Sequence, residues 1–285
     1  MLDWVTESFE AQRPRLLRIA YRMLGSHAEA EDVVQDAWLR WYGTDHAGIR
    51  KPAAWLTRIV TRLCLNRMNA ARARHETYPG TWLPEPLIEP EPDDDLRLDH
   101  LTLTLMMALE RLSPLERAAF LLHDVFGQPL GEVASTIDRS PAATRQLASR
   151  ARAHVQVDRP RNPVSRETGA ALTKAFFNAC SSGDTQALGA ILADDVTLHS
   201  DGGGKIRSFN VIRGAERVVR LYAGLARKLG SGVQMISSVV IDGLPGFVSR
   251  IDDALQTTAL EIDGERITRI YITRNPDKLR SIRLH

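Results

Sequence analysis

The stretch from Ser140 to Arg152 constrains the fold most, because it has the pattern of a helix with one cationic face. Ser140 is a favourable N-cap, and Pro141 suits the first helical position, where its missing N–H would have had no partner. The inward stripe at helical spacing consists of Thr144, Leu147, Ala148 and Ala151. The outward face carries Arg145, Gln146, Ser149, Arg150 and Arg152. The pattern therefore predicts a helix that can lie against a polyanion.

A second short helix is predicted just upstream, at residues 130–137. Its apolar positions are Leu130, Val133, Ala134 and Ile137. Two short helices joined through Asp138 and Arg139 indicate a helix-turn-helix, whose second helix can enter a major groove. The alternative is an ordinary helical hairpin with a solvated arginine face, and this stretch alone leaves both interpretations open.

Charge is segregated along the chain, although the net charge of its 285 residues is only +2. Residues 50–75 hold seven Lys and Arg and no acid, whereas residues 85–99 hold seven acids and Arg97 alone. The length suffices for two or three domains. Cys64 and Cys180 lack metal-ligand spacing and are expected in different domains, which favours a reducing compartment. Because we find no secretory leader and no apolar run of the ~18 residues that a membrane span needs, we expect a cytoplasmic protein. We expect it to need no metal or cofactor.

Two long helices are predicted in the first third of the chain. Ser26 and Glu29 form a capping box, and the helix after them is strongly periodic. Its exposed face carries Glu29, Asp32, Gln35 and Asp36. No lysine of the same helix pairs these carboxylates, so the face is either simply solvated or a docking surface for a basic partner.

The second of these helices begins at Pro52 and runs to about residue 73. Its outer strip carries Trp55, Arg58, Arg62, Asn66 and Asn69. Basic and amide side chains beside an aromatic ring suit contacts to phosphates, base edges and unstacked bases. Trp55 fits the core equally well.

Periodicity is lost from about residue 75 to 99, where prolines punctuate an acidic stretch typical of a linker. Within it, Trp82–Leu87 is too apolar for a solvated tether, and we expect it to dock on another part of the protein. Helices resume near Leu96, with a capping box at Ser113–Glu116 and a helix to about Val125.

The pattern changes after Pro163. Helices are predicted at 167–181, 184–193 and 214–229, and strands at 196–200, 233–241, 246–251, 255–262 and 266–273. Helices followed by an antiparallel meander favour an α+β domain, with a curved sheet wrapped on helices. Asp201–Lys205 is a glycine-rich turn, for which a flexible hairpin is a serious alternative.

Three motifs resemble the sigma-70 family of bacterial transcription initiation factors, specifically the extracytoplasmic-function type. They are Ala30–Asp36 followed by Trp38, Pro52–Leu56, and Leu112–Arg117 before the helix-turn-helix. The C-terminal part resembles a SnoaL-like domain of the NTF2-like fold, which one group of these factors carries. Trp82–Leu87, Asp201–Lys205 and Asn275–Leu279 resemble that group's hallmark motifs.

The resemblance implies two all-α domains followed by an α+β domain. Residues 1–76 correspond to sigma region 2, 77–99 to the linker, 100–158 to sigma region 4 and 166–285 to the SnoaL-like domain. The implied partners are core RNA polymerase, through its β′ clamp helices and β flap, and promoter DNA.

Roles transfer by position within the resemblance. Polymerase binding falls on Glu29, Asp32, Gln35 and Asp36. Contact with the −10 element falls on Trp55, Arg58, Arg62, Asn66 and Asn69. Contact with the −35 element falls on Ser140, Thr144, Arg145, Gln146, Ser149 and Arg150. Asp138 and Arg139 depart from the family pattern of glycine and an apolar residue, but aspartate tolerates a left-handed turn.

The fused domain is expected to regulate activity in cis, in place of a separate anti-sigma protein. Its regulatory residues would lie in the three hallmark motifs, with the second and third contacting the first. These residues are Trp82, Leu83, Pro84, Glu85, Pro86 and Leu87, then Asp201, Gly202, Gly203, Gly204 and Lys205, and finally Asn275, Pro276, Asp277, Lys278 and Leu279.

Three alternatives remain at this stage. The C-terminal fold also houses cyclases and isomerases, for which the candidate groups are Asp195, His199, Asp201 and Tyr222. An apolar cavity without convergent acid and base groups would instead favour a small-molecule sensor. An autonomous dimeric helix-turn-helix regulator would explain the Ser140 helix but would leave the acidic face and the Pro52 helix without a role.

Overall fold

The computed structural model describes residues 2–75, 78, 80–88, 101–156 and 164–282. The chain forms two compact units. Residues 1–77 and 106–158 make up the first, and residues 78–105 and 159–285 the second. Trp82–Leu87 thus belongs to the same unit as the C-terminal part. None of the helices that the structure describes combines the length and apolar character of a bilayer span.

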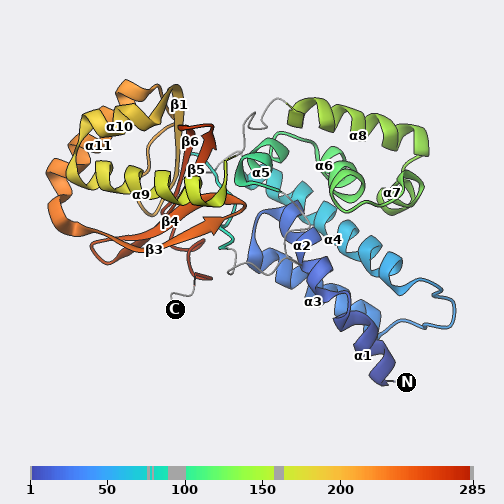
Figure 1. Cartoon of the computed structure of the whole chain (residues 1–285). Coiled ribbons are helices and arrows are strands. Elements are labelled where there is room, and N and C mark those ends of the chain that lie inside the picture. Colours follow the sequence, from blue (N-terminus) through green and yellow to red (C-terminus); the bar gives the residue numbers. More distant parts are fainter. Residues whose placement is uncertain (1, 76–77, 79, 89–100, 157–163, 283–285) are drawn as a thin grey trace. The chain divides into compact units, whose positions relative to one another are not determined.

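The first unit is all-helical (Figure 1). Its elements are α1 (Leu2–Glu10), α2 (Arg13–Leu24), α3 (His27–Tyr42), α4 (Pro52–His75), α6 (Pro114–Phe120), the π-helical turn η2 (Leu121–Val125), α7 (Leu130–Ile137) and α8 (Pro141–Gln156). A turn at Ala11 and Gln12 separates α1 from α2. Pro14 explains this break, because its ring would clash with the carbonyl of Glu10 in one continuous helix. α5 (Leu103–Leu109) contains the division between the units, and the predicted helical start near Leu96 lies outside the described residues.

Local capping signals set the helix ends. Gly25 ends α2 in the left-handed conformation (φ 69°), and the hydroxyl of Ser26 accepts a hydrogen bond from the Glu29 N–H. Both bonds of the predicted Ser113–Glu116 capping box are present. Asp138 adopts φ 55° between α7 and α8, so the departure from the family's glycine is accommodated as expected.

Two buried polar side chains join the helices of this unit. The Trp41 indole N–H donates to the carbonyl oxygen of Val5 at 2.9 Å. The buried Arg117 guanidinium donates to the carbonyl of Arg22 at 3.1 Å and pairs with Glu110 at 2.5 Å, which ties α6 to the end of α2. A buried arginine is tolerated because hydrogen-bond partners meet it.

The second unit contains α9 (Arg166–Ser182), α10 (Thr185–Ile191), α11 (Ala215–Leu229), the short turn η3 (Gly230–Gly232) and a six-stranded sheet. The strands are β1 (Leu192–Asp201), β2 (Ile212–Arg213), β3 (Val233–Ile241), β4 (Leu244–Ile251), β5 (Ala254–Asp263) and β6 (Arg266–Thr273), in the order β2-β1-β6-β5-β4-β3. The four predicted meander strands are confirmed as antiparallel, and β1 pairs with β6 in parallel. β2 was missed because two residues carry no periodic signal.

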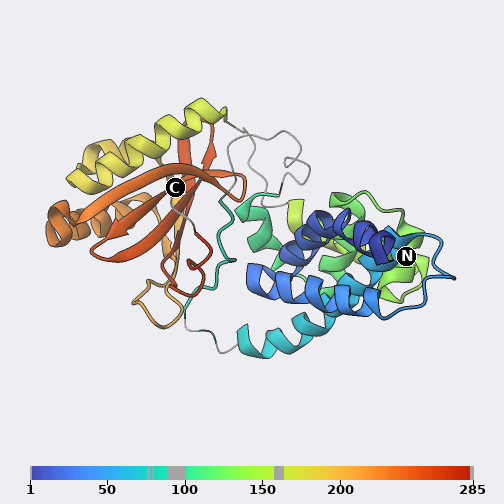
Figure 2. The same ribbon diagram turned by 90° about the horizontal axis from the view of Figure 1, so that it is seen from below.

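The core of this unit lies between the helices and one face of the curved sheet (Figure 1 and Figure 2). It includes Phe176, Leu188, Leu198, Val218, Phe247, Leu260 and Ile270. This is the α+β arrangement, with a curved sheet wrapped on helices, that the sequence pattern predicted. Cys64 and Cys180 are both free thiols, and they lie in different units as expected.

Candidate functional site

The acidic strip on α3, defined as Glu29, Asp32, Gln35 and Asp36, is partly or fully exposed. The side chains of Asp32 and Asp36 are 66% and 48% exposed. The strip is not unpaired, however. Arg67 of α4 reaches Asp32 at 3.5 Å and Asp36 at 3.2 Å, and also donates to the Glu29 carbonyl at 3.1 Å. The helical pattern of α3 could not reveal this partner, because Arg67 lies on another helix.

The outer face of α4 presents Arg58, Arg62, Asn66 and Asn69 to solvent, as the pattern predicted. Trp55 is half-buried, and its ring lies 5.3 Å from that of Trp41. This contact supports the core interpretation of Trp55. Arg62 is shared with the helix-turn-helix, since its Nε atom donates to the carbonyl oxygen of Thr136 at 3.5 Å.

The second helix of the helix-turn-helix, α8, and its N-cap expose Ser140, Arg145, Gln146, Ser149 and Arg150. The Ser140 hydroxyl also caps the helix by accepting from the Ala143 N–H at 3.2 Å. Arg150 pairs with Glu116 at 3.1 Å but keeps 64% of its side chain exposed.

Thr144 requires a correction. It is 0% exposed, and its hydroxyl donates to the carbonyl of Ser140. It therefore belongs to the inward stripe and is omitted from the DNA-contact set proposed below.

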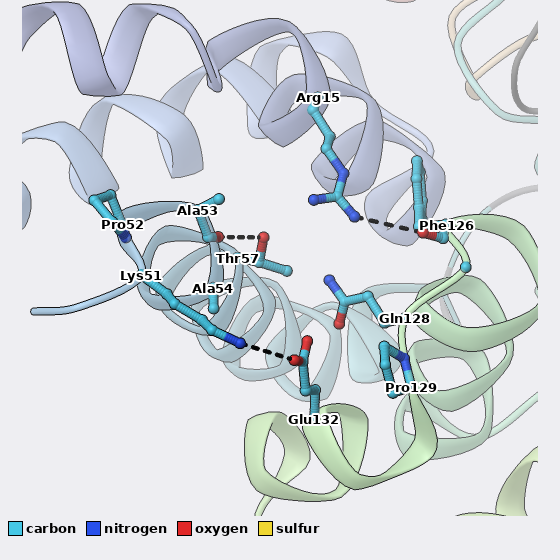
Figure 3. A pocket seen from close by; sticks show the side chains of 11 residues that line it. Arg15, Lys51, Pro52, Ala53, Ala54, Thr57, Phe126, Gln128, Pro129 and Glu132 are labelled. Carbon is cyan, nitrogen blue, oxygen red and sulfur yellow. Dashed lines mark hydrogen bonds and ion pairs between the residues drawn. The ribbon is translucent and has the colours of Figure 1, made fainter.

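A cavity of about 470 Å³ lies beside the N-terminus of α4, within the first unit (Figure 3). Lys51 pairs with Glu132 of α7 at 3.8 Å, and Arg15 donates to the carbonyl of Phe126 at 3.5 Å. Figure 3 shows the Gln128 side chain extending between these two contacts. The Lys51–Glu132 pair is exposed and long, so it contributes little to holding α7 beside α4.

The linker clamp is the set Tyr78, Leu83, Asp201, Asn275 and Lys278 within the second unit. The buried Asp201 carboxylate accepts from the Tyr78 hydroxyl at 2.6 Å and the Leu83 N–H at 3.0 Å. The Lys278 ammonium pairs with the same carboxylate at 2.7 Å and donates to the Leu83 carbonyl. The Asn275 amide donates to Tyr78 at 3.0 Å. Trp82–Leu87 therefore docks on the C-terminal domain, as expected.

Two further contacts lie beside the clamp. Lys278 lies 4.3 Å over the Trp82 ring, and Lys205 pairs with Asp277 at 2.5 Å. Burial, together with the hydrogen bond to Asp201, raises the pKa of the Tyr78 hydroxyl above its usual range. Tyr78 stays neutral at physiological pH and acts as a donor.

The glycine-rich turn is tightly packed rather than a free hairpin. A Cβ on Gly202 would lie 1.9 Å from the Ile206 carbonyl oxygen, and one on Gly203 would lie 2.4 Å from the Asn275 side chain. Gly203 and Gly204 also adopt positive φ. The glycines are needed so that the second and third hallmark motifs can touch.

A second docking point holds Leu87, the last residue of the Trp82–Leu87 motif. Leu87 and the buried Asp242 exchange two hydrogen bonds, from the Leu87 N–H to the carboxylate at 3.0 Å and from the Asp242 N–H to the Leu87 carbonyl at 2.9 Å. Pro84, Glu85 and Pro86 between the two points are buried. Nothing in the sequence around Asp242 indicates a docked partner, because Leu87 lies 155 positions away.

The four candidate catalytic groups do not converge. Asp195 is exposed, and Asp201 is occupied by the clamp. His199 stacks on Tyr271, with ring centroids 5.3 Å apart, and burial followed by the nearby Arg269 and Arg213 lowers its pKa to about 4. Of the four, Tyr222 is the one that lines the large cavity of this domain. The arrangement holds no acid–base pair of the kind that the enzyme alternative requires.

Comparison with known proteins agrees with this architecture. The family models Sigma-70 region 2 and Sigma-70, region 4 match residues 9–74 and 102–155. The ECF RNA polymerase sigma factor SigJ of Mycobacterium tuberculosis is 37% identical over 290 residues, which cover 95% of this chain and 91% of SigJ. The probable ECF RNA polymerase sigma factor SigI of the same species is 31% identical over 287 residues, covering 99% and 97% of the two chains.

A solved structure extends the likeness to the whole fold. The crystal structure of M. tuberculosis SigJ covers 98% of this chain and 100% of that chain, with 34% identity and a TM-score of 0.79. The likeness includes the C-terminal α+β domain as well as the helical regions. The chain therefore belongs to the extracytoplasmic-function sigma factors of RNA polymerase, with an α+β domain fused after region 4.

Proposed function

We propose that this sigma factor docks on the β′ clamp helices of core RNA polymerase through the acidic strip of α3 and recognises promoters through α4 and α8. The observation that carries the proposal is the separation of charge: exposed carboxylates lie on α3, whereas exposed arginines and amides lie on α4 and α8. Complementary charge favours docking to a basic partner, and cationic faces favour DNA. Polymerase supplies the chemistry.

The two DNA-binding faces have different tasks in this proposal. Arg145, Gln146 and Ser149 project from a helix that can enter the major groove at the −35 element and donate to base edges. Arg58, Arg62 and Asn66 offer contacts to the strand that is exposed when the −10 element opens. Unstacking each base step costs a few kcal/mol, which these contacts must offset.

Arg145 provides the first test. The Arg145→Ala change should lower the affinity of the polymerase complex for its promoter about tenfold, because one good base contact contributes ~1–3 kcal/mol. Electrophoretic mobility shift with reconstituted polymerase measures this affinity. Arg13→Ala is the matched control, since Arg13 is an exposed arginine on α2, outside both proposed DNA-binding faces. Equal affinities for the two variants would remove Arg145 from the contact set.

We further propose that the C-terminal domain regulates the sigma regions in cis by holding the linker in the clamp. The buried Asp201–Lys278 pair and the Leu87–Asp242 bonds support this role, because they restrict the segment that connects regions 2 and 4. A fixed linker limits the separations that the two DNA-binding faces can reach.

Truncation provides the second test. A chain that ends at residue 165 should still bind core polymerase within about twofold of the full chain, because the acidic strip is retained. Its run-off transcript yield should differ at least threefold, in either direction, because the linker is released from the clamp. Unchanged yield would contradict regulation in cis, whereas lost core binding would contradict the assignment of the docking surface.

The C-terminal domain itself is proposed to sense rather than to catalyse. Its large cavity is predominantly apolar, and the candidate catalytic groups other than Tyr222 lie elsewhere. An apolar cavity of this kind binds ligands well but lacks the paired groups that proton transfer requires.

A further inference from the structure

The C-terminal domain encloses a cavity of about 740 Å³ that the linker clamp does not use. Its walls come from α9, α11, strands β1 and β3 to β6, and the segment that follows β1. Apolar atoms make up most of the lining surface, and the lining includes Phe176, Phe177, Leu221, Phe247 and Ile272. A volume of this size accommodates a ligand of roughly the size of a drug molecule.

Some hydroxyl groups in this lining are buried without a hydrogen-bond partner among the described residues. Ser200 is 1% exposed and Ser249 is 0% exposed, and the hydroxyl oxygens of both, as well as that of Ser181, make no hydrogen bond with the part of the chain that the structure describes. Burying a hydroxyl group without a hydrogen-bond partner is unfavourable, so native proteins normally satisfy it. These hydroxyls point to a ligand with polar atoms.

Arg274 supplies a positive charge at the same cavity. It is half-buried, and burial lowers the pKa of its guanidinium group from the usual value. Its Nη1 atom donates to the carbonyl of Arg207 at 3.3 Å, and no carboxylate forms an ion pair with it among the residues that the structure describes. A desolvated guanidinium without a counter-ion favours binding of an anion.

The sheet register places several of these polar groups in neighbouring rows on one face of the sheet. Ser249 of β4 is opposite Gln256 of β5, and the next β5 residue, Thr257, is opposite Thr273 of β6. Arg274 therefore continues the row formed by Ser249 and Gln256.

The neighbouring row on the same face, two residues along each strand, contains Ser200, Ile272, Thr258 and Phe247. All of these side chains line the cavity. Adjacent strands are about 4.8 Å apart, so the row of Ser249, Gln256 and Arg274 forms a polar and cationic end of this sheet wall, beside the row that contains Phe247 and Ile272.

We propose that this cavity binds an apolar monocarboxylic acid, with its carboxylate at Arg274 and the unpaired serine hydroxyls and its hydrocarbon body against Phe176, Phe247 and Ile272. Arginine pairs with a carboxylate in a bidentate geometry, and hydroxyl donors complete the shell. Asp252 is the acidic residue among the described cavity-lining residues, and it lies in the turn after β4. Arg207, Arg220 and Lys228 also line the cavity, but Arg274 is the cation that continues the sheet row of Ser249 and Gln256. The inference deepens the proposed sensing role and rests on it.

Calorimetric titration of the full chain tests the ligand class. The probes are dodecanoate and 1-naphthoate as long-chain and aromatic acids, with dodecan-1-ol and dodecyltrimethylammonium as neutral and cationic counterparts, all below their micellar concentrations. At least one acid should bind at least tenfold more tightly than the alcohol, and the cation should not bind. Absence of binding by both acids, or equal affinity for acid and alcohol, would overturn the proposal.

Two variants locate the site. Arg274→Gln should reduce the preference for acid over alcohol to less than threefold, whereas Arg213→Gln, on β2 outside the cavity lining, should retain it. Gly224→Phe adds a ring where a Cβ would meet no atom within 4 Å, so it should fill the cavity and block all probes in a folded protein. Thermal melting confirms folding. An unchanged acid preference in Arg274→Gln would contradict the assignment.

The experiments can contradict the proposed ligand class and the proposed regulatory role independently. If an acid binds as expected but does not change run-off transcription, the sensing role fails while the ligand class stands. If no acid binds but truncation at residue 165 still changes transcription, the ligand class fails while regulation in cis stands.

Discussion

Replacing both Asp32 and Asp36 with lysine should lower the affinity of the chain for core RNA polymerase at least about 100-fold. The two carboxylates are largely exposed and form the centre of the acidic strip on α3. Reversal converts attraction for a basic partner into repulsion, and close interfacial charge pairs contribute several kcal/mol. Native gel electrophoresis with purified core enzyme measures the association.

Folding is expected to survive this double change. Both carboxylates pair with Arg67, but exposed ion pairs contribute only about 0–1 kcal/mol each. Glu31→Lys is the matched control, because Glu31 is exposed on the same helix but lies outside the strip. The control should bind core enzyme like the wild type. Wild-type affinity in the Asp32→Lys, Asp36→Lys double variant would rule out the α3 docking surface.

The second large effect is expected from Asp201→Ala. The change removes the acceptor for the Tyr78 hydroxyl, the Leu83 and Gly203 N–H groups and the Lys278 ammonium. Removing one partner of a buried ion pair typically costs about 3–5 kcal/mol, because the other charge is left buried. We therefore expect a loss of that size in the free energy of unfolding of the second unit, measured by denaturant titration. Hydrogen exchange should show lost protection at the Leu83 amide.

Lys205→Met is the control for Asp201→Ala, because it removes an ion pair beside the clamp and leaves the clamp itself intact. Lys205 and Asp277 form an ion pair in the same motifs, but about half of each side chain is exposed. Its removal should change stability by less than about 1 kcal/mol and leave the linker protected. Equal losses for Asp201→Ala and Lys205→Met would show that the buried carboxylate has no special part in docking.

Features set by neighbouring residues could be predicted from the sequence. The capping serines, the apolar stripes of α3 and α8 and the four meander strands all depend on short-range patterns, and the structure confirms them. The left-handed Asp138 followed from the tolerance of aspartate for that conformation. The acidic and basic faces were predicted for the same reason, since helical spacing alone assigns a side chain to a face.

Features that depend on distant residues could not be predicted in the same way. Arg67 turns to the acidic strip on α3, and Asp242 binds a linker residue that lies 155 positions away in the sequence. Thr144 was assigned both to the inward stripe of α8 and to the −35 contact set, and its burial supports the inward stripe. The polar end of the cavity depends on the register of four strands, and no single strand contains that information.

Run-off transcription with purified core RNA polymerase tests the central claim most directly. The full chain should produce a promoter-specific transcript that core enzyme alone does not make, and the Asp32→Lys, Asp36→Lys double variant should produce none. A promoter-specific transcript of wild-type yield from the double variant, or no promoter-specific transcript from the full chain on any promoter of a genomic library, would contradict the account.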